Sequence, residues 1–138
     1  MTSKQEKKVL FTNFNKEYFE LLDYMKGQLK DNKDYNSFYR KNKLLKKTNI
    51  KLIIKTWHTS ITLIYKEPIM KKDIDFFLNN DYSEQIEENK EFSSCYSVVY
   101  YINELKNMYE TISNDCIDNV MNKIHNLTKI TDLYYKIK

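Results

Sequence analysis

The 138-residue sequence contains one glycine, one proline, one arginine and no alanine. A single glycine excludes the glycine-rich loops that cradle phosphate groups in nucleotide-binding sites. Lysine, asparagine, isoleucine, tyrosine and phenylalanine, whose codons are rich in A and T, are abundant instead, and an AT-rich genome explains this bias. The surplus of lysine is therefore not by itself evidence for nucleic-acid binding.

Long apolar runs and a disulfide framework are also missing. No window reaches the ~18 consecutive apolar residues that a membrane span needs, so we expect no membrane partner. The first residues, MTSKQEKKVLF, lack the apolar core of a secretory signal. The only cysteines, Cys95 and Cys116, do not form a disulfide framework. These absences predict a reducing, cytoplasmic setting.

Apolar residues recur at the spacing of an α-helix over almost the whole chain. The first stripe consists of Phe14, Tyr18, Leu21, Leu22, Met25 and Leu29. The third stripe is broad and consists of Ile50, Ile53, Ile54, Trp57, Ile61, Ile64 and Tyr65. Further stripes cover residues 34–45, 92–112 and 117–134. Strict alternation, the sign of a strand, is absent, so the pattern predicts helices.

The stripes together predict an all-α fold, a single compact bundle-like domain of five or six helices over residues 1–138. Residues 1–12 are expected to form a flexible N-terminal arm. Pro68 lacks an amide hydrogen and disfavours helix at Glu67, so we expect a break there. Short helices are predicted to follow between Pro68 and Glu88.

Charge is distributed unevenly along the chain. Residues 1–72 carry a net charge of +10, residues 73–91 a net charge of −6, and residues 92–138 are balanced. A basic half and an acidic block on one chain suit contacts with a partner or with a second copy.

The stretch KKDIDFFLNNDYSE matches a calcium-binding loop in part. Asp73, Asp75 and Glu84 occupy the first, third and twelfth positions of such a loop, where oxygen ligands are required. Phe77 at the fifth position cannot bind a metal, and Leu78 stands at the sixth, where the sharp turn requires glycine. We therefore interpret the stretch as a structural turn with an acidic surface and predict no metal site.

Histidine and cysteine offer little catalytic chemistry. His58, His125, Cys95 and Cys116 form no His-x-x-x-His or Cys-x-x-Cys pair, although a zinc site assembled in space stays an open alternative. No glycine-rich turn or oxyanion motif supports a cysteine nucleophile. We predict no enzyme, no catalytic residue and no cofactor.

The segment YRKNKLLKKTNIK is the strongest candidate binding feature. Its cations are Arg40, Lys41, Lys43, Lys46, Lys47 and Lys51. We favour a solvated lysine face, and the alternative is binding of nucleic-acid phosphates without sequence specificity. The candidate residues for protein interaction are those of the acidic block: Asp81, Glu84, Glu87, Glu88 and Glu91.

Two short patterns support a resemblance to a family. The chain contains Phe14-Asn15 followed by Tyr18-Phe19, and later the run DIDFFLNNDY from Asp73 to Tyr82. In these features it resembles small uncharacterised proteins of giant nucleocytoplasmic large DNA viruses. The resemblance implies a viral protein made in the host cytoplasm, in a viral factory, or packaged in the virion.

These observations lead to one expected function and one alternative. We expect a non-enzymatic viral binding protein, a structural or assembly component of the particle or replication factory. Its partner would be a viral or host protein, or a second copy of itself. The alternative is a basic nucleic-acid-associated factor that binds phosphate backbones through Arg40–Lys51.

Overall fold

A computed structural model describes residues 2–31, 33–73, 75–76 and 114–137 of the chain. These residues are largely helical and none of them lies in a strand, which confirms the all-α prediction. The elements are α1 (Ser3–Gln28), α2 (Lys33–Thr48), α3 (Lys51–Trp57), the π-helical turn η1 (His58–Thr62), α4 (Leu63–Met70) and α8 (Asn114–Lys136).

The helix count differs from the prediction. Elements α3, η1 and α4 follow one another without interruption, so they form one continuous rod over residues 51–70. The described residues therefore form four long helical units, and five or six is an overcount for this part of the chain. The helices predicted over residues 83–91 and 92–112 lie outside the described residues.

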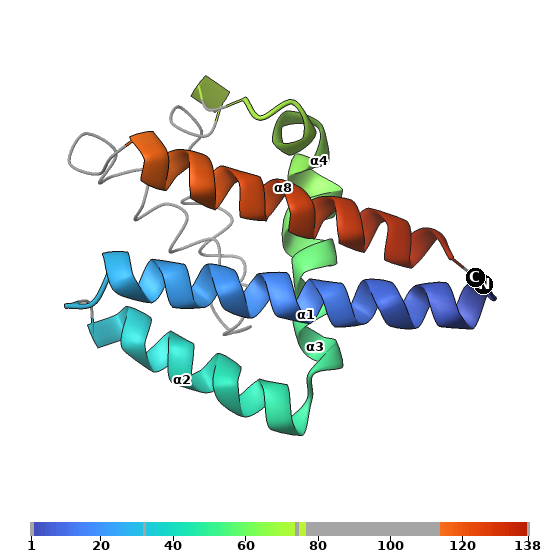
Figure 1. Ribbon diagram of the computed structural model, residues 1–138, viewed down its shortest axis with the longest axis horizontal. Helices are drawn as coiled ribbons and strands as arrows, with labels where there is room; N and C mark the ends of the chain where they lie inside the picture. The colour runs from blue at the N-terminus through green and yellow to red at the C-terminus, as the bar shows by residue number, and fades with distance from the viewer. Residues whose placement is uncertain (1, 32, 74, 77–113, 138) are drawn as a thin grey trace.

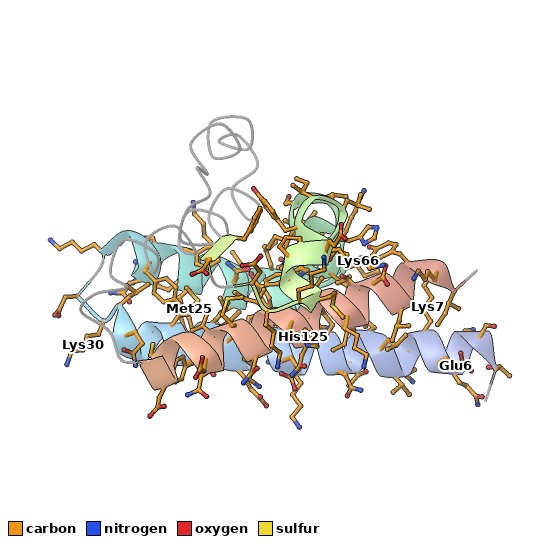
Figure 2. The ribbon with its side chains drawn as sticks, turned by 90° about the horizontal axis from the view of Figure 1, so that it is seen from above. Glu6, Lys7, Met25, Lys30, Lys66 and His125 are labelled. Carbon is orange, nitrogen blue, oxygen red and sulfur yellow. The ribbon has the colours of Figure 1, made fainter. Side chains whose placement is uncertain are left out.

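The helices form two layers (Figure 1). Helices α1 and α8 run antiparallel in one layer, and their ends meet where the Lys7 ammonium lies 4.7 Å from the Tyr134 ring centroid. Helix α2 and the rod pack behind them, as the view from above shows (Figure 2). None of the described helices is long and apolar enough to cross a membrane.

Helix α1 begins earlier than the sequence suggested. The Gln5 amide donates to Thr2 Oγ1 over 3.2 Å, and the Thr2 amide donates to Gln5 Oε1 over 2.9 Å. This reciprocal pair is a capping box, which satisfies two amides that the first turn leaves without helical partners. Residues 3–12, which were expected to lie in an N-terminal arm, are part of this helix.

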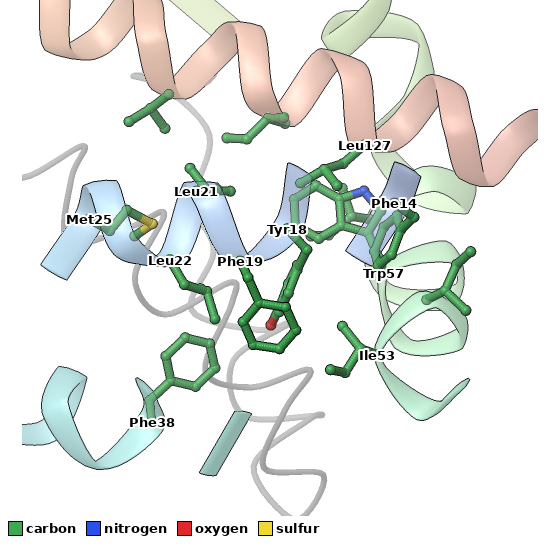
Figure 3. Close-up of a cluster of buried hydrophobic side chains, with 14 of the residues drawn as sticks. Phe14, Tyr18, Phe19, Leu21, Leu22, Met25, Phe38, Ile53, Trp57 and Leu127 are labelled. Carbon is green, nitrogen blue, oxygen red and sulfur yellow. The ribbon is translucent and has the colours of Figure 1, made fainter. Parts of the chain in front are cut away.

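The core lies where the two layers meet (Figure 3). The Trp57 ring meets Phe14 and Tyr18 edge-on, with centroids 6.3 and 6.2 Å away. The first stripe predicted from the sequence is buried: Phe14, Tyr18, Leu21, Leu22, Met25 and Leu29. Aromatic rings therefore fill much of the space between α1, the rod and α8.

Pro68 does not break the rod where the sequence predicted. It lies inside α4, which continues for two residues beyond it to Met70, although proline has no amide hydrogen to donate within the helix. The end itself is a Schellman arrangement: the Lys72 amide donates to the Ile69 carbonyl and the Asp73 amide to the Pro68 carbonyl, each over 3.0 Å. Lys72 adopts the required left-handed conformation, with φ of 53°.

Candidate binding surfaces

A buried polar junction joins the rod to α8. Trp57 Nε1 donates to Thr128 Oγ1 over 3.2 Å, and the hydroxyl oxygens of Thr62 and Thr131 lie 2.5 Å apart. The Thr131 hydroxyl donates to the Thr128 carbonyl over 3.0 Å. All four side chains are buried, so this junction holds the helices together and does not face a ligand.

His58 lies at the edge of this junction. Its ring stacks on Tyr135 with centroids 4.1 Å apart, and burial lowers the pKa of the imidazole although the Asp132 carboxylate opposes this. Burial by itself would raise the pKa of Asp132. The ammonium groups of Lys66 and Lys136, 2.9 and 3.0 Å from Asp132 Oδ2, instead hold the pKa of this carboxyl below its ordinary value. Burial therefore favours the neutral form of the His58 imidazole, and the two lysines favour the charged form of the Asp132 carboxylate.

The other candidate chemistry of the sequence is not assembled in the part of the chain that the structure describes. Within residues 2–31, 33–73, 75–76 and 114–137, no group of three His, Cys, Asp or Glu side chains is placed to hold a metal ion. Cys116 is buried on α8, and Cys95 lies outside the described residues. His125 is half-buried on α8.

The first residues of the stretch KKDIDFFLNNDYSE have a structural role. The Phe76 amide donates to Asp73 Oδ1 over 3.0 Å, so Asp73 caps the backbone that follows it, and Asp75 is exposed. Phe77, Leu78 and Glu84 lie outside the described residues. The five acidic candidates for protein interaction lie there too: Asp81, Glu84, Glu87, Glu88 and Glu91.

The structure divides the basic segment into two groups. Lys43 and Lys46 extend over the ring of Phe19 on α1, with ammonium-to-centroid distances of 5.3 and 4.9 Å. At such distances the ring attracts the ammonium, so these two lysines help to attach α2 to α1.

The remaining cations of the segment are exposed and form no ion pair with any residue that the structure describes. Lys55 belongs with them, since it is exposed one turn after Lys51 on α3. We call this set the basic face: Arg40, Lys41, Lys47, Lys51 and Lys55. The spacing of four residues between Lys51 and Lys55 could have revealed Lys55 from the sequence.

The outer side of α4 carries apolar side chains. Leu63 and Ile64 are 67% and 55% exposed, and they border an open groove of about 550 Å³. The groove is lined by Leu63, Ile64, Lys66, Glu67, Met70 and Lys71, which we call the α4 face. Lys66 projects from the rod (Figure 2) and pairs with Asp132 of α8.

Ile64 was predicted to be buried, and this prediction is wrong. The π turn at His58–Thr62 winds its chain with more residues per turn than an α-helix, so positions after it no longer follow the 3.6-residue stripe. Ile53, Trp57, Ile61 and Ile69 are buried at spacings of four and eight residues. The π turn therefore keeps Ile69 in the core and leaves Ile64 outside.

Comparison with known proteins gives no relative from which a function could be transferred. No protein-family model, curated protein or solved structure matches the chain.

Proposed function

We propose that the protein is a non-enzymatic binding protein that associates with a second copy of itself through the α4 face, as a component of an assembly. The observation that carries the proposal is the exposure of Leu63 and Ile64 on a rod whose opposite side is in the core. Single exposed apolar residues are ordinary on protein surfaces. Here two neighbours and Met70 border one groove, which is the pattern of a contact surface.

The α4 face is complementary to itself. If a two-fold axis passes between Lys66 and Glu67, an antiparallel copy places its Met70 beside Leu63 and its Glu67 beside Lys66. Such an isologous contact uses the same patch on both copies. It covers apolar surface and matches opposite charges at the same time.

The charges on this face are available for such a contact. Lys66 and Lys136 share one carboxylate, that of Asp132, so positive charge remains in excess there. Among the residues that the structure describes, Glu67 pairs only with Lys71, over a long contact of 3.5 Å, and both side chains are mostly exposed. An exposed pair of this kind contributes little to stability, so Glu67 can exchange its partner at small cost.

The size of the face predicts weak association. Stable protein interfaces bury roughly 800 Å² on each partner, which an eight-residue helix cannot supply by itself. We therefore expect a monomer at low concentration and reversible pairing only at high concentration, which suits a unit that is reinforced by many neighbours in an assembly.

Sedimentation velocity over a concentration series tests the proposal. Leu63→Glu should abolish the concentration dependence, and Leu44→Glu provides a matched control because Leu44 is 61% exposed on α2, away from the α4 face. Glu67→Lys should also weaken pairing, since it places like charges opposite each other. A chain that stays monomeric throughout, or that loses association equally with Leu44→Glu, would contradict the proposal.

The viral setting is a further part of the proposal, and its support is the sequence resemblance to small proteins of giant DNA viruses. In that setting the assembly is the virion or the replication factory in the host cytoplasm. Detection of the chain by mass spectrometry in purified particles or isolated factories tests this part. Recovery of the protein only from soluble host fractions would contradict it.

A further inference from the structure

We infer that the basic face of α2 and α3 binds the phosphate backbone of nucleic acid, without reading its sequence. This binding site is separate from the α4 face and does not depend on self-association. The argument starts from the charges on this part of the chain.

The basic face lies in a stretch without acids. No aspartate or glutamate occurs between Asp34 and Glu67, while that interval contains eight cations: Arg40, Lys41, Lys43, Lys46, Lys47, Lys51, Lys55 and Lys66. Lys51 and Lys55 face the same side of α3 one turn apart, and like charges at this spacing repel each other in a helix. A polyanion would remove this repulsion.

Two glutamates of the neighbouring helix α1 are engaged with α8, and Asp23 of α1 is engaged with Tyr39 of α2. Glu17 and Glu20 both contact Lys123 of α8, at 2.7 and 2.5 Å. Asp23 accepts a hydrogen bond from the Tyr39 hydroxyl over 2.5 Å, and this bond raises the pKa of Tyr39. No carboxylate that the structure describes forms an ion pair with a cation of the basic face.

The chemistry of the face favours nucleic acid over a membrane surface. A helix that binds a membrane must direct a broad apolar stripe into the lipid. The apolar stripe of α2 is already used in the core, where Tyr35 and Phe38 are buried, and Leu44 is the one large apolar side chain exposed on α2. The exposed side of α2 can therefore offer charge but little apolar surface.

The same chemistry limits what the face can recognise. Four of its five cations are lysines, which attract phosphates as point charges and lack the forked geometry with which arginine reads bases. Contacts of this kind fix a protein on the backbone and carry no sequence information. Binding should therefore be salt-sensitive and nearly equal for unrelated sequences.

The test is a salt titration with a fluorescent random-sequence DNA duplex and the full chain, read by anisotropy. Each cation that contacts a phosphate contributes roughly 0.9 to the slope of log K against log salt. The triple variant Lys41→Gln, Lys47→Gln, Lys51→Gln should reduce the magnitude of that slope by roughly 2 to 3. It should also reduce affinity for the duplex at least ~10-fold at low salt.

A matched control removes the same charge elsewhere. Lys4, Lys8 and Lys129 are exposed, and each has an acid within three residues, so their change to Gln should leave the slope nearly unchanged. Changing Lys41, Lys47 and Lys51 to Arg should preserve the slope. Circular dichroism checks that every variant remains helical.

Three results would overturn the inference. The first is an equal decrease of the salt dependence in the Lys4, Lys8, Lys129 variant. The second is loss of duplex binding in the arginine variant while it remains helical. The third is tighter binding to phosphatidylserine vesicles than to the duplex. An absence of duplex binding by the unaltered chain at low salt would overturn it as well. Leu63→Glu should leave duplex binding intact, which separates this site from the α4 face.

Discussion

The buried hydroxyl pair between the rod and α8 allows a directional prediction. The Thr131 hydroxyl has one hydrogen, and it is donated to the Thr128 carbonyl, so the contact between the two hydroxyls must be a donation from Thr62 to Thr131. The two threonines are 2% and 0% exposed, so water cannot replace a lost partner. Removing the acceptor should therefore cost more than removing the donor.

The expected magnitudes follow from this direction. Thr131→Val leaves the Thr62 hydroxyl buried without an acceptor, which should cost about 1–3 kcal/mol. Thr62→Val leaves the Thr131 hydroxyl bonded to the Thr128 carbonyl and should cost about 0.5–1.5 kcal/mol, the value of one hydrogen bond. The double variant places two valines of matching shape together, so its cost should be less than the sum, with a coupling of about 1 kcal/mol.

Urea unfolding at neutral pH measures these free energies. Ellipticity at 222 nm reports the helices, and fluorescence of Trp57, the single tryptophan, reports the junction itself. Coincident transitions would justify a two-state treatment. The reasoning is refuted if Thr62→Val costs more than Thr131→Val, or if the two losses are additive.

Three further predictions concern stability. Gly27→Ala should raise it by about 0.5–1 kcal/mol, because an added Cβ meets nothing within 4 Å and alanine favours the helix; a loss in urea unfolding would contradict this. Because burial lowers the pKa of His58 below 6.5, the unfolded chain binds more protons, and stability should fall as pH drops through that value. His58→Gln should flatten that part of the pH profile of the urea midpoint, and an unchanged profile would contradict this. Lys123→Met leaves two glutamates on α1 without their partner and should lower the free energy of unfolding by about 1 kcal/mol. The loss should be smaller in molar salt, which screens the ion pairs. An unchanged urea midpoint would contradict a stabilising role for these ion pairs.

Helical periodicity predicted the parts of the fold in which regular helices face the core. The stripe from Phe14 to Met25 and the inner positions of α8, such as Ile124 and Leu127, are buried as their spacing required. These positions were predictable because a 3.6-residue repeat needs no knowledge of the partner helix. The same reasoning could not show that α1 pairs with α8, since spacing within a helix does not name its neighbour.

Irregular backbone explains the errors. A π turn has no clear signature in HTSIT, so the sequence could not show that Ile64 leaves the core or that the rod continues through Pro68. The division of the basic segment was hidden for another reason. Which lysines extend over Phe19 depends on how α2 crosses α1, and this is a property of packing between helices.

The pairing of α1 with α8 has a consequence for the time course of folding. It joins the first and last described helices, and the contact between Glu17 and Lys123 spans 106 positions of the chain. Closing so long a loop costs entropy before any contact compensates for it, so this pairing should be a slow event. A nascent chain must also carry Phe14 and Tyr18 without their α8 cover until Leu127 has been synthesised. Translational pausing before α8 would therefore prolong the period in which the chain is most prone to aggregate.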